Sequence, residues 1–151
     1  MHNYKAGLDI LLAEDDPNDV FFFKQACEKL PNLNSFHAVA HARAAIDYLE
    51  AHCVHGPDGA ASLPTLVVSD LKMPGGDGFD LLRWLKNHKS CKVIPAIILS
   101  ASSLEQDVQL AYELGANAYL TKPGNIDELR LLVQKTFDFW RMCQRAGSPG
   151  A

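Results

Sequence analysis

The stretch Leu66-Val67-Val68-Ser69-Asp70-Leu71-Lys72-Met73-Pro74-Gly75-Gly76-Asp77-Gly78 decides how this chain folds. It begins with a short apolar run, which is typical of a strand buried on both faces of a parallel sheet. Asp70 ends this run, and the proline and three glycines that follow predict a tight turn beside the carboxylate. Because ligands of open α/β sheets bind beyond the carboxyl ends of the strands, we expect Asp70 to lie in a binding site.

Charged residues also end two other apolar runs of the chain. Glu14 and Asp15 follow the run at 10–13, and Lys122 follows the run at 118–121. Parallel strands present their carboxyl ends at the same edge of a sheet, so these side chains should converge on Asp70.

A site of this composition favours phosphate chemistry. Three carboxylates in one place repel one another unless a cation lies among them, and oxygen ligands of this kind suit Mg²⁺. An aspartate can attack phosphorus to form an acyl phosphate, while Mg²⁺ and a lysine neutralise the transferred oxygens. We therefore predict Asp70 as the nucleophile and Lys122 as the phosphate cation. Ser100, which ends a further apolar run, is placed to bond a phosphoryl oxygen.

Strand-like and helix-like segments alternate along the whole chain. We expect strands over 8–13, 36–40, 65–69, 93–99 and 118–120. We expect helices from Asp16-Pro17 to about 30, over 42–51 and 79–87, from a capping box at Ser102 and Glu105 to Gly115, and from Asn125 to about Cys143. Leu104 is expected on the inner face of the fourth helix. This alternation predicts an α/β fold, a doubly wound five-stranded parallel sheet with right-handed crossovers.

Composition narrows the class of protein further. A chain of 151 residues with 48% hydrophobic residues fits one domain, which we expect over 8–143 with an N-terminal extension over 1–7, a surface loop over 52–64 and a disordered tail over 144–151. The net charge of −4 argues against nucleic acid as a partner, and no apolar run is long enough for a membrane span. We expect a cytoplasmic protein whose four cysteines are reduced, because their spacing forms neither a disulfide framework nor a zinc motif.

Four motifs together resemble the receiver domain of two-component response regulators, the CheY-like superfamily, over about residues 8–140. They are Leu11-Leu12-Ala13-Glu14-Asp15-Asp16, the stretch from Asp70 to Gly78, Ser100-Ala101 and Tyr119-Leu120-Thr121-Lys122-Pro123. The resemblance implies a flavodoxin-like (βα)5 fold with strand order 2-1-3-4-5. It also implies that Asp70 accepts a phosphoryl group from the phosphohistidine of a sensor histidine kinase or of a histidine phosphotransfer protein.

The resemblance assigns a role to each residue of the site. The Mg²⁺ ligands would be Glu14, Asp15, Asp70 and the backbone carbonyl of Lys72. Ser100 would be the switch hydroxyl, Lys122 the phosphate cation and Tyr119 the aromatic switch, and a cis peptide would precede Pro123.

The resemblance also suggests what lies outside the site. Short chains with this opening motif resemble the single-domain regulators paired with phytochrome-type kinases, which act through protein–protein contacts with an unknown downstream protein. Receivers often dimerise through helix 4, strand 5 and helix 5, and a second apolar stripe on the last helix predicts a homodimer here. Three consecutive aromatic residues, Phe21-Phe22-Phe23, cannot all face inward from one helix, and Phe21 or Phe22 is expected to contact the kinase.

The main alternative is an enzyme, an aspartate-nucleophile phosphatase of the haloacid dehalogenase type. Such phosphatases also carry their nucleophile at the end of a parallel strand, but they need a second acid two residues later, where this chain has Lys72. We therefore favour a phosphoacceptor that is not an enzyme over a phosphatase.

Overall fold

Five short parallel strands form the centre of the computed structural model, which describes residues 7–53 and 63–143. The elements in chain order are β1 Leu8–Ala13, α1 Pro17–Glu28, β2 Leu33–Val39, α2 Ala42–Cys53, β3 Leu66–Ser69, α3 Gly78–Asn87, β4 Ala96–Ser100, α4 Glu105–Glu113, β5 Ala118–Thr121 and α5 Ile126–Met142, with a short 3-10 helix, Cys91–Val93, before β4. The strand order is β2-β1-β3-β4-β5 and every pair is parallel, which confirms the predicted doubly wound, flavodoxin-like sheet.

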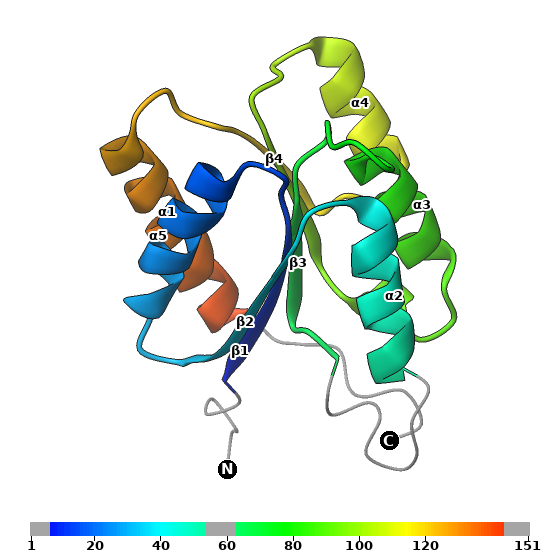
Figure 1. The fold of residues 1–151 in the computed structure, drawn as a ribbon, viewed down its shortest axis with the longest axis horizontal. Coiled ribbons are helices and arrows are strands. Elements are labelled where there is room, and N and C mark those ends of the chain that lie inside the picture. Colours follow the sequence, from blue (N-terminus) through cyan, green and yellow to red (C-terminus); the bar gives the residue numbers. More distant parts are fainter. Residues whose placement is uncertain (1–6, 54–62, 144–151) are drawn as a thin grey trace.

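Helices cover both faces of the sheet, as Figure 1 shows. One face packs against α1 and α5, and the other packs against α2, α3 and α4. Side chains alternate between the two layers along β1, where Ile10 and Leu12 face α1 and α5 while Leu11 and Ala13 face the opposite layer. This burial on both faces explains why the central strands have continuous apolar sequences.

The pairing register brings the ends of the strands together. Ala13 at the end of β1 pairs with Ser69 at the end of β3, and Ser100 at the end of β4 pairs with Thr121 at the end of β5. The residues that follow these four therefore emerge at one edge of the sheet.

Side chains cap three of the helices at their first turns. Asp16 accepts a hydrogen bond from the Asn18 N–H at the start of α1, and Asn125 accepts one from the Glu128 N–H at the start of α5. Both of these caps confirm the predictions from sequence. Asp77 and Asp80 form a reciprocal capping box at the start of α3.

The fourth helix starts later than its sequence indicates. Its N-cap is Leu104, and Ser102 instead accepts the Leu104 N–H at 3.3 Å and donates to Asp107 at 2.6 Å. The capping box predicted at Ser102 and Glu105 is therefore wrong, because the hydroxyl is satisfied by a local turn and by Asp107. Leu104 is 53% exposed and does not lie on the inner face of α4.

Two strands also differ from their predicted bounds. The strand β2 starts at Leu33 rather than at 36, since pairing with β1 continues to Leu8 across an irregular register. The strand β4 starts at Ala96 rather than at 93, because residues 91–93 form the 3-10 helix and Pro95 has no N–H to donate to a neighbouring strand.

Several predictions concern residues that the structure does not describe. These are the N-terminal extension, apart from Gly7, the greater part of the loop predicted at 52–64, and the tail at 144–151. Among the described residues, no helix combines the length and the apolar character needed to cross a bilayer.

Candidate functional site

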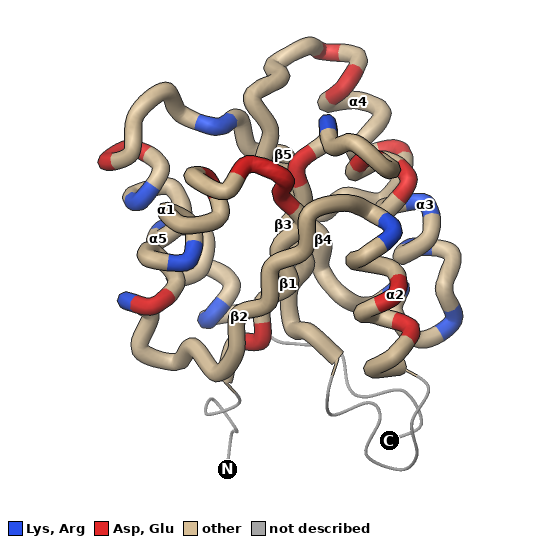
Figure 2. The backbone as a smooth tube through the Cα atoms, in the orientation of Figure 1, with Lys and Arg blue, Asp and Glu red and all other residues tan. Residues whose placement is uncertain are grey.

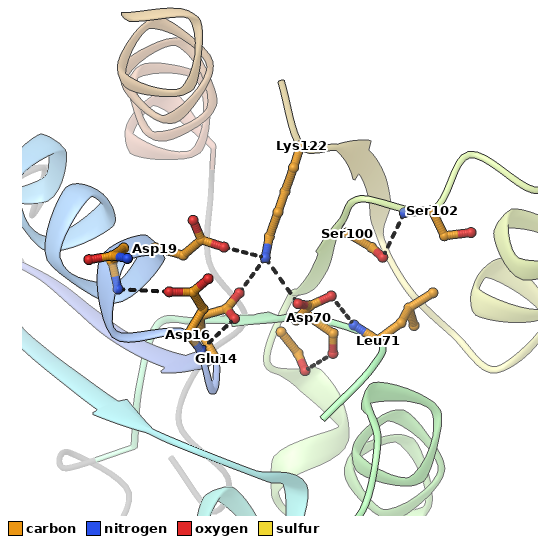
Figure 3. A network of polar contacts seen from close by, with 10 residues as sticks. Glu14, Asp16, Asp19, Asp70, Leu71, Ser100, Ser102 and Lys122 are labelled. Carbon is orange, nitrogen blue, oxygen red and sulfur yellow. Dashed lines mark hydrogen bonds and ion pairs between the residues drawn. The ribbon is translucent and has the colours of Figure 1, made fainter. Parts of the chain in front are cut away.

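The ammonium group of Lys122 lies at the centre of a cluster of carboxylates at the carboxyl edge of the sheet. Its Nζ is 2.5 Å from Glu14 Oε2, 2.9 Å from Asp19 Oδ2 and 3.0 Å from Asp70 Oδ2. The lysine side chain extends from the end of β5 and points between Asp19 and Asp70 (Figure 3). Three segments far apart in the sequence are thus joined by one cation.

Local backbone contacts fix the position of Asp70. Its N–H donates to the carbonyl of Ala13 at 2.9 Å, which continues the β1–β3 pairing, and its Oδ1 accepts the N–H of Leu71 at 2.7 Å. Gly78 closes the following turn by donating its N–H to the carbonyl of Leu71 at 2.9 Å. A Cβ at position 78 would lie 2.3 Å from the carbonyl oxygen of Asp70, so only glycine allows the start of α3 to come this close.

Burial changes the protonation behaviour of this cluster. Glu14 is only 5% exposed, and its burial raises the pKa from 4.5 to about 7 despite the hydrogen bonds from Lys122 and from the Asp16 N–H. Burial acts in the opposite direction on Lys122, but its hydrogen bonds to Glu14, Asp19 and Asp70 outweigh this effect and raise its pKa. The lysine therefore stays charged, whereas Glu14 exchanges its proton near neutral pH.

The predicted metal ligands lie together at this edge. Oxygen atoms of Glu14, Asp15 and Asp70 all lie within 4.8 Å of one another, and Figure 2 shows acidic residues gathered where β1 and β3 end. Asp15 is exposed to solvent, which leaves room for a hydrated ion beside it. An oxygen donor set with one open side fits Mg²⁺, which binds through few carboxylates and keeps several waters. Lys72 lies two residues beyond Asp70 in the same turn, with its side chain exposed.

Ser100 and Tyr119 form hydrogen bonds with the loop that follows β4, and not with the carboxylates around Lys122. Ser100 is 2% exposed, and its Oγ accepts the N–H of Ser102 at 3.2 Å. The hydroxyl of Tyr119 donates to the carbonyl of Ser102 at 2.7 Å. The backbone of Ser102 therefore connects the end of β4 with the aromatic ring on β5.

The sequence analysis missed one residue of this site. Asp19 lies in the first turn of α1 and binds Lys122 at 2.9 Å, although its side chain is 34% exposed. A signal for it existed, because Asp16 and Pro17 start a helix directly after the acidic pair, and the first turn of such a helix must stay near the same edge of the sheet. Negative charge is also favourable in this first turn.

The cis peptide predicted before Pro123 is wrong. The bond between Lys122 and Pro123 is trans, since both residues are described and the described residues contain no cis peptide. With this trans bond, the Lys122 N–H donates to the carbonyl of Ser100 at 2.7 Å and the Lys122 side chain reaches the carboxylates. The ordinary preference for trans then prevails.

Comparison with known proteins agrees with this geometry. The family model described as "Response regulator receiver domain" matches residues 10–134. A probable methanogenesis regulatory protein, FilR2 of Methanothrix harundinacea, is 31% identical over 140 residues, which cover 93% of this chain and 88% of that protein.

Two solved structures are similar to the chain over almost all of its length. One is the phosphorylated cyanobacterial phytochrome response regulator RcpA, at 30% identity and a TM-score of 0.83, with 96% of this chain and 100% of the other covered. The second is the Mn²⁺-bound form of the response regulator Rcp1, at 29% identity and a TM-score of 0.81, with 93% and 99% covered.

Proposed function

The chain belongs to the response regulator receiver domain family, and from this premise we propose that Asp70 accepts a phosphoryl group from the phosphohistidine of a histidine kinase or of a histidine phosphotransfer protein. In this transfer the P–N bond of the donor breaks and a P–O bond to an Asp70 carboxylate oxygen forms. One observation carries the proposal: the carboxylate at the end of β3 lies 3.0 Å from the partly buried ammonium group of Lys122 and beside two further acids. The ammonium can neutralise an oxygen of the incoming phosphoryl group.

Mg²⁺ would be held by Glu14, Asp15, Asp70 and the backbone carbonyl of Lys72. When bound, it neutralises the charge of the transferring oxygens. The support is the all-oxygen cluster within 4.8 Å, together with the Mn²⁺ named for the similar Rcp1. Glu14 must lose its proton to act as a ligand, which links metal binding to pH.

The phosphorylated state would be read by Ser100, Lys122 and Tyr119. The Ser100 oxygen accepts the Ser102 N–H, and its own O–H can donate to a phosphoryl oxygen. Turning this hydroxyl towards the phosphoryl group would move it relative to the Ser102 backbone, whose carbonyl also holds the Tyr119 hydroxyl. A charge-assisted hydrogen bond contributes roughly 1.5–3 kcal/mol, which is enough to shift a two-state loop by about ten- to a hundredfold. Phosphorylation would in this way change the surface formed by α4 and β5.

Partners would recognise two surfaces. Phe21, two residues after Asp19 on α1, is 56% exposed, and we assign it to the contact with the kinase. The similarity to phytochrome response regulators suggests a phytochrome-type kinase, in the cytoplasm. A homodimer would use α4, β5 and α5, since large apolar side chains are exposed at the N-cap of α4, on α4 and on α5. These are Leu104, Tyr112, Ile126, Leu131 and Phe139.

Labelling with a small phosphodonor tests the central proposal. Acetyl phosphate with Mg²⁺ should give one adduct on Asp70 that hydroxylamine removes, and Asp70→Asn should give none. Asp77→Asn is the matched control, because this carboxylate caps α3 in the following turn and should leave labelling intact. Unchanged labelling in Asp70→Asn would refute the assignment, and steady turnover of many phosphomonoesters would favour the phosphatase alternative.

Sedimentation tests the proposed dimer separately. The phosphorylated protein should sediment as a dimer at micromolar concentration, and Phe139→Ser should weaken the association without changing the labelling of Asp70. A monomer in both phosphorylation states would exclude this surface as a dimer interface.

A further inference from the structure

A second cluster of reactive side chains lies at the opposite edge of the sheet from Asp70. Cys53 ends α2, His88 follows α3, and Cys91 begins the 3-10 helix before β4. The two sulfur atoms and a ring nitrogen of His88 all lie within 4.8 Å of one another. In Figure 1 this end of α2 lies at the far end of the sheet from the loops that carry the carboxylates.

The hydrogen bonds of His88 determine where its proton lies. Its Nδ1 accepts the N–H groups of Ser90 and Cys91, both at 3.1 Å, so Nδ1 carries no hydrogen. The opposite ring orientation would place a carbon atom against these two N–H groups and leave them unpaired. The proton of the neutral ring therefore lies on Nε2, which is 4.0 Å from the sulfur of Cys53.

This tautomer favours thiol chemistry over metal binding. A metal ion bound at Nε2 needs that nitrogen without its proton, and the proton would then have to move to Nδ1, against the two backbone donors. The Nε2–H group lies 4.0 Å from the sulfur of Cys53 and is instead placed to donate to that sulfur during its reaction. A thiolate beside a second thiol is the arrangement that forms a disulfide.

We propose that Cys53 and Cys91 are a redox modification site, which a peroxide converts into an intramolecular disulfide. The Cys53 thiolate attacks the peroxide, whose O–O bond breaks; one oxygen becomes the S–OH group and the other leaves as hydroxide, which takes up a proton to give water. The Cys91 sulfur then attacks Cys53, the S–S bond forms, the S–O bond breaks, and the departing hydroxide takes the Cys91 proton. The two thiols together lose two protons and two electrons, and the peroxide becomes two waters.

The two cysteines have unequal roles in this sequence of steps. Cys53 is half-buried and can meet an oxidant, whereas Cys91 is 0% exposed and can react only with its neighbour. Burial and the adjacent Cys53 also raise the pKa of Cys91 to about 12, which keeps it protonated until Cys53 has been oxidised. The disulfide would tie the end of α2 to the turn after α3, at a distance from the phosphorylation site.

Alkylation of the full chain tests the proposal. The reduced protein is treated with hydrogen peroxide in the presence of a chelator, then denatured and alkylated with N-ethylmaleimide. The untreated protein should take up four alkyl groups, one for each cysteine, and the oxidised protein two. Peptide mapping should find Cys53 linked to Cys91, and dithiothreitol should restore all four sites.

Variants show which residues the disulfide link depends on. Cys53→Ser and Cys91→Ser should each abolish the link, and Cys53→Ser keeps the test valid if the buried Cys91 cannot be replaced without unfolding. Cys143→Ser should form the link as the parent does, because this half-buried cysteine lies at the end of α5. Asp70→Asn should also form it, which distinguishes the outcome from that of the phosphorylation proposal.

His88→Asn tests the positioning role of the ring. An asparagine oxygen can still accept the two backbone N–H groups, but it has no Nε2–H for Cys53, so the link should form more slowly. Peroxide that leaves four alkylation sites, or that links Cys53 only to a second chain, would overturn the proposal. Stoichiometric Zn²⁺ binding that protects both thiols and is lost in Cys53→Ser would overturn it in favour of a metal site.

Discussion

Mg²⁺ should bind more tightly as pH rises through neutrality, and Glu14 should be the cause. Burial places the pKa of this carboxyl at about 7, so roughly one-tenth of it is ionised at pH 6 and roughly nine-tenths at pH 8. If Glu14 is a metal ligand, a proton competes with the metal for it. The dissociation constant should then fall about tenfold between these pH values, a change of about 1.4 kcal/mol in binding free energy.

Isothermal titration calorimetry measures both parts of this expectation. Titrations at pH 6, 7 and 8 give the affinity, and repeats in buffers of different ionisation enthalpy count the protons released. Close to half a proton should be released at pH 7, and the number should fall towards zero at pH 8 as Glu14 is already ionised.

Glu14→Gln isolates the contribution of this carboxyl. The amide keeps an oxygen that can accept from Lys122, but it cannot titrate, so Mg²⁺ should bind more weakly and with little change between pH 6 and 8. Glu28→Gln, at an exposed position on α1, should keep the full pH dependence of the parent. A tenfold pH effect that persists in Glu14→Gln, or a parent protein whose affinity does not depend on pH, would refute the reasoning.

Further predictions concern stability and labelling. Without divalent metal, the free energy of unfolding should fall by up to about 3 kcal/mol as pH rises from 4.5 to 7, because folded Glu14 keeps a proton that the unfolded chain releases. Urea titrations of the parent protein should show this decrease, and those of Glu14→Gln should not. Gly78→Ala should lose about 1–3 kcal/mol of stability and most Asp70 labelling, since its Cβ would meet the Asp70 backbone at 2.3 Å. Gly124→Ala, which has open space around the new Cβ, is the matched control and should behave like the parent in both measurements. Asp19→Asn should lower the free energy of unfolding by about 1 kcal/mol, as expected for the loss of a partly exposed ion pair. It should also raise the fraction of Asp70 labelled by acetyl phosphate, because Lys122 is then freed for the phosphoryl group. Reduced labelling would show that the Asp19 carboxylate instead assists the transfer.

The sequence predicted most of the fold because strands that are buried on both faces of a sheet have continuous apolar sequences. Continuous apolar runs identified the central strands β1, β3 and β4, Asp16 and Asn125 identified two helix starts, and both caps were confirmed. It failed at Ser102, where a hydroxyl that can cap a helix binds Asp107 instead. Glu105 and Asp107 both lie within five residues of Ser102, so the capping pattern by itself does not decide which partner the hydroxyl takes.

Part of the candidate site could be predicted from the sequence, and part could not. The sequence by itself placed Glu14, Asp15, Asp70 and Lys122 at one edge, because parallel strands end together and each of these residues directly follows a strand. Only the tertiary structure brought Asp19 to the lysine, since that contact depends on how α1 leaves the sheet and which way its first turn faces.

The tertiary structure alone also paired Cys53 with Cys91 beside His88. The spacing of the cysteines along the chain indicated no pairing, and the contact exists because α2 packs beside α3 and the turn after α3 returns to it. The residue at which a buried strand ends can be recognised from the strand's own sequence. The approach of two helices, in contrast, is determined by the side chains packed between them. That is why the sequence determined the edge of the sheet that carries the candidate phosphorylation site, and why only the fold revealed the residues that meet elsewhere.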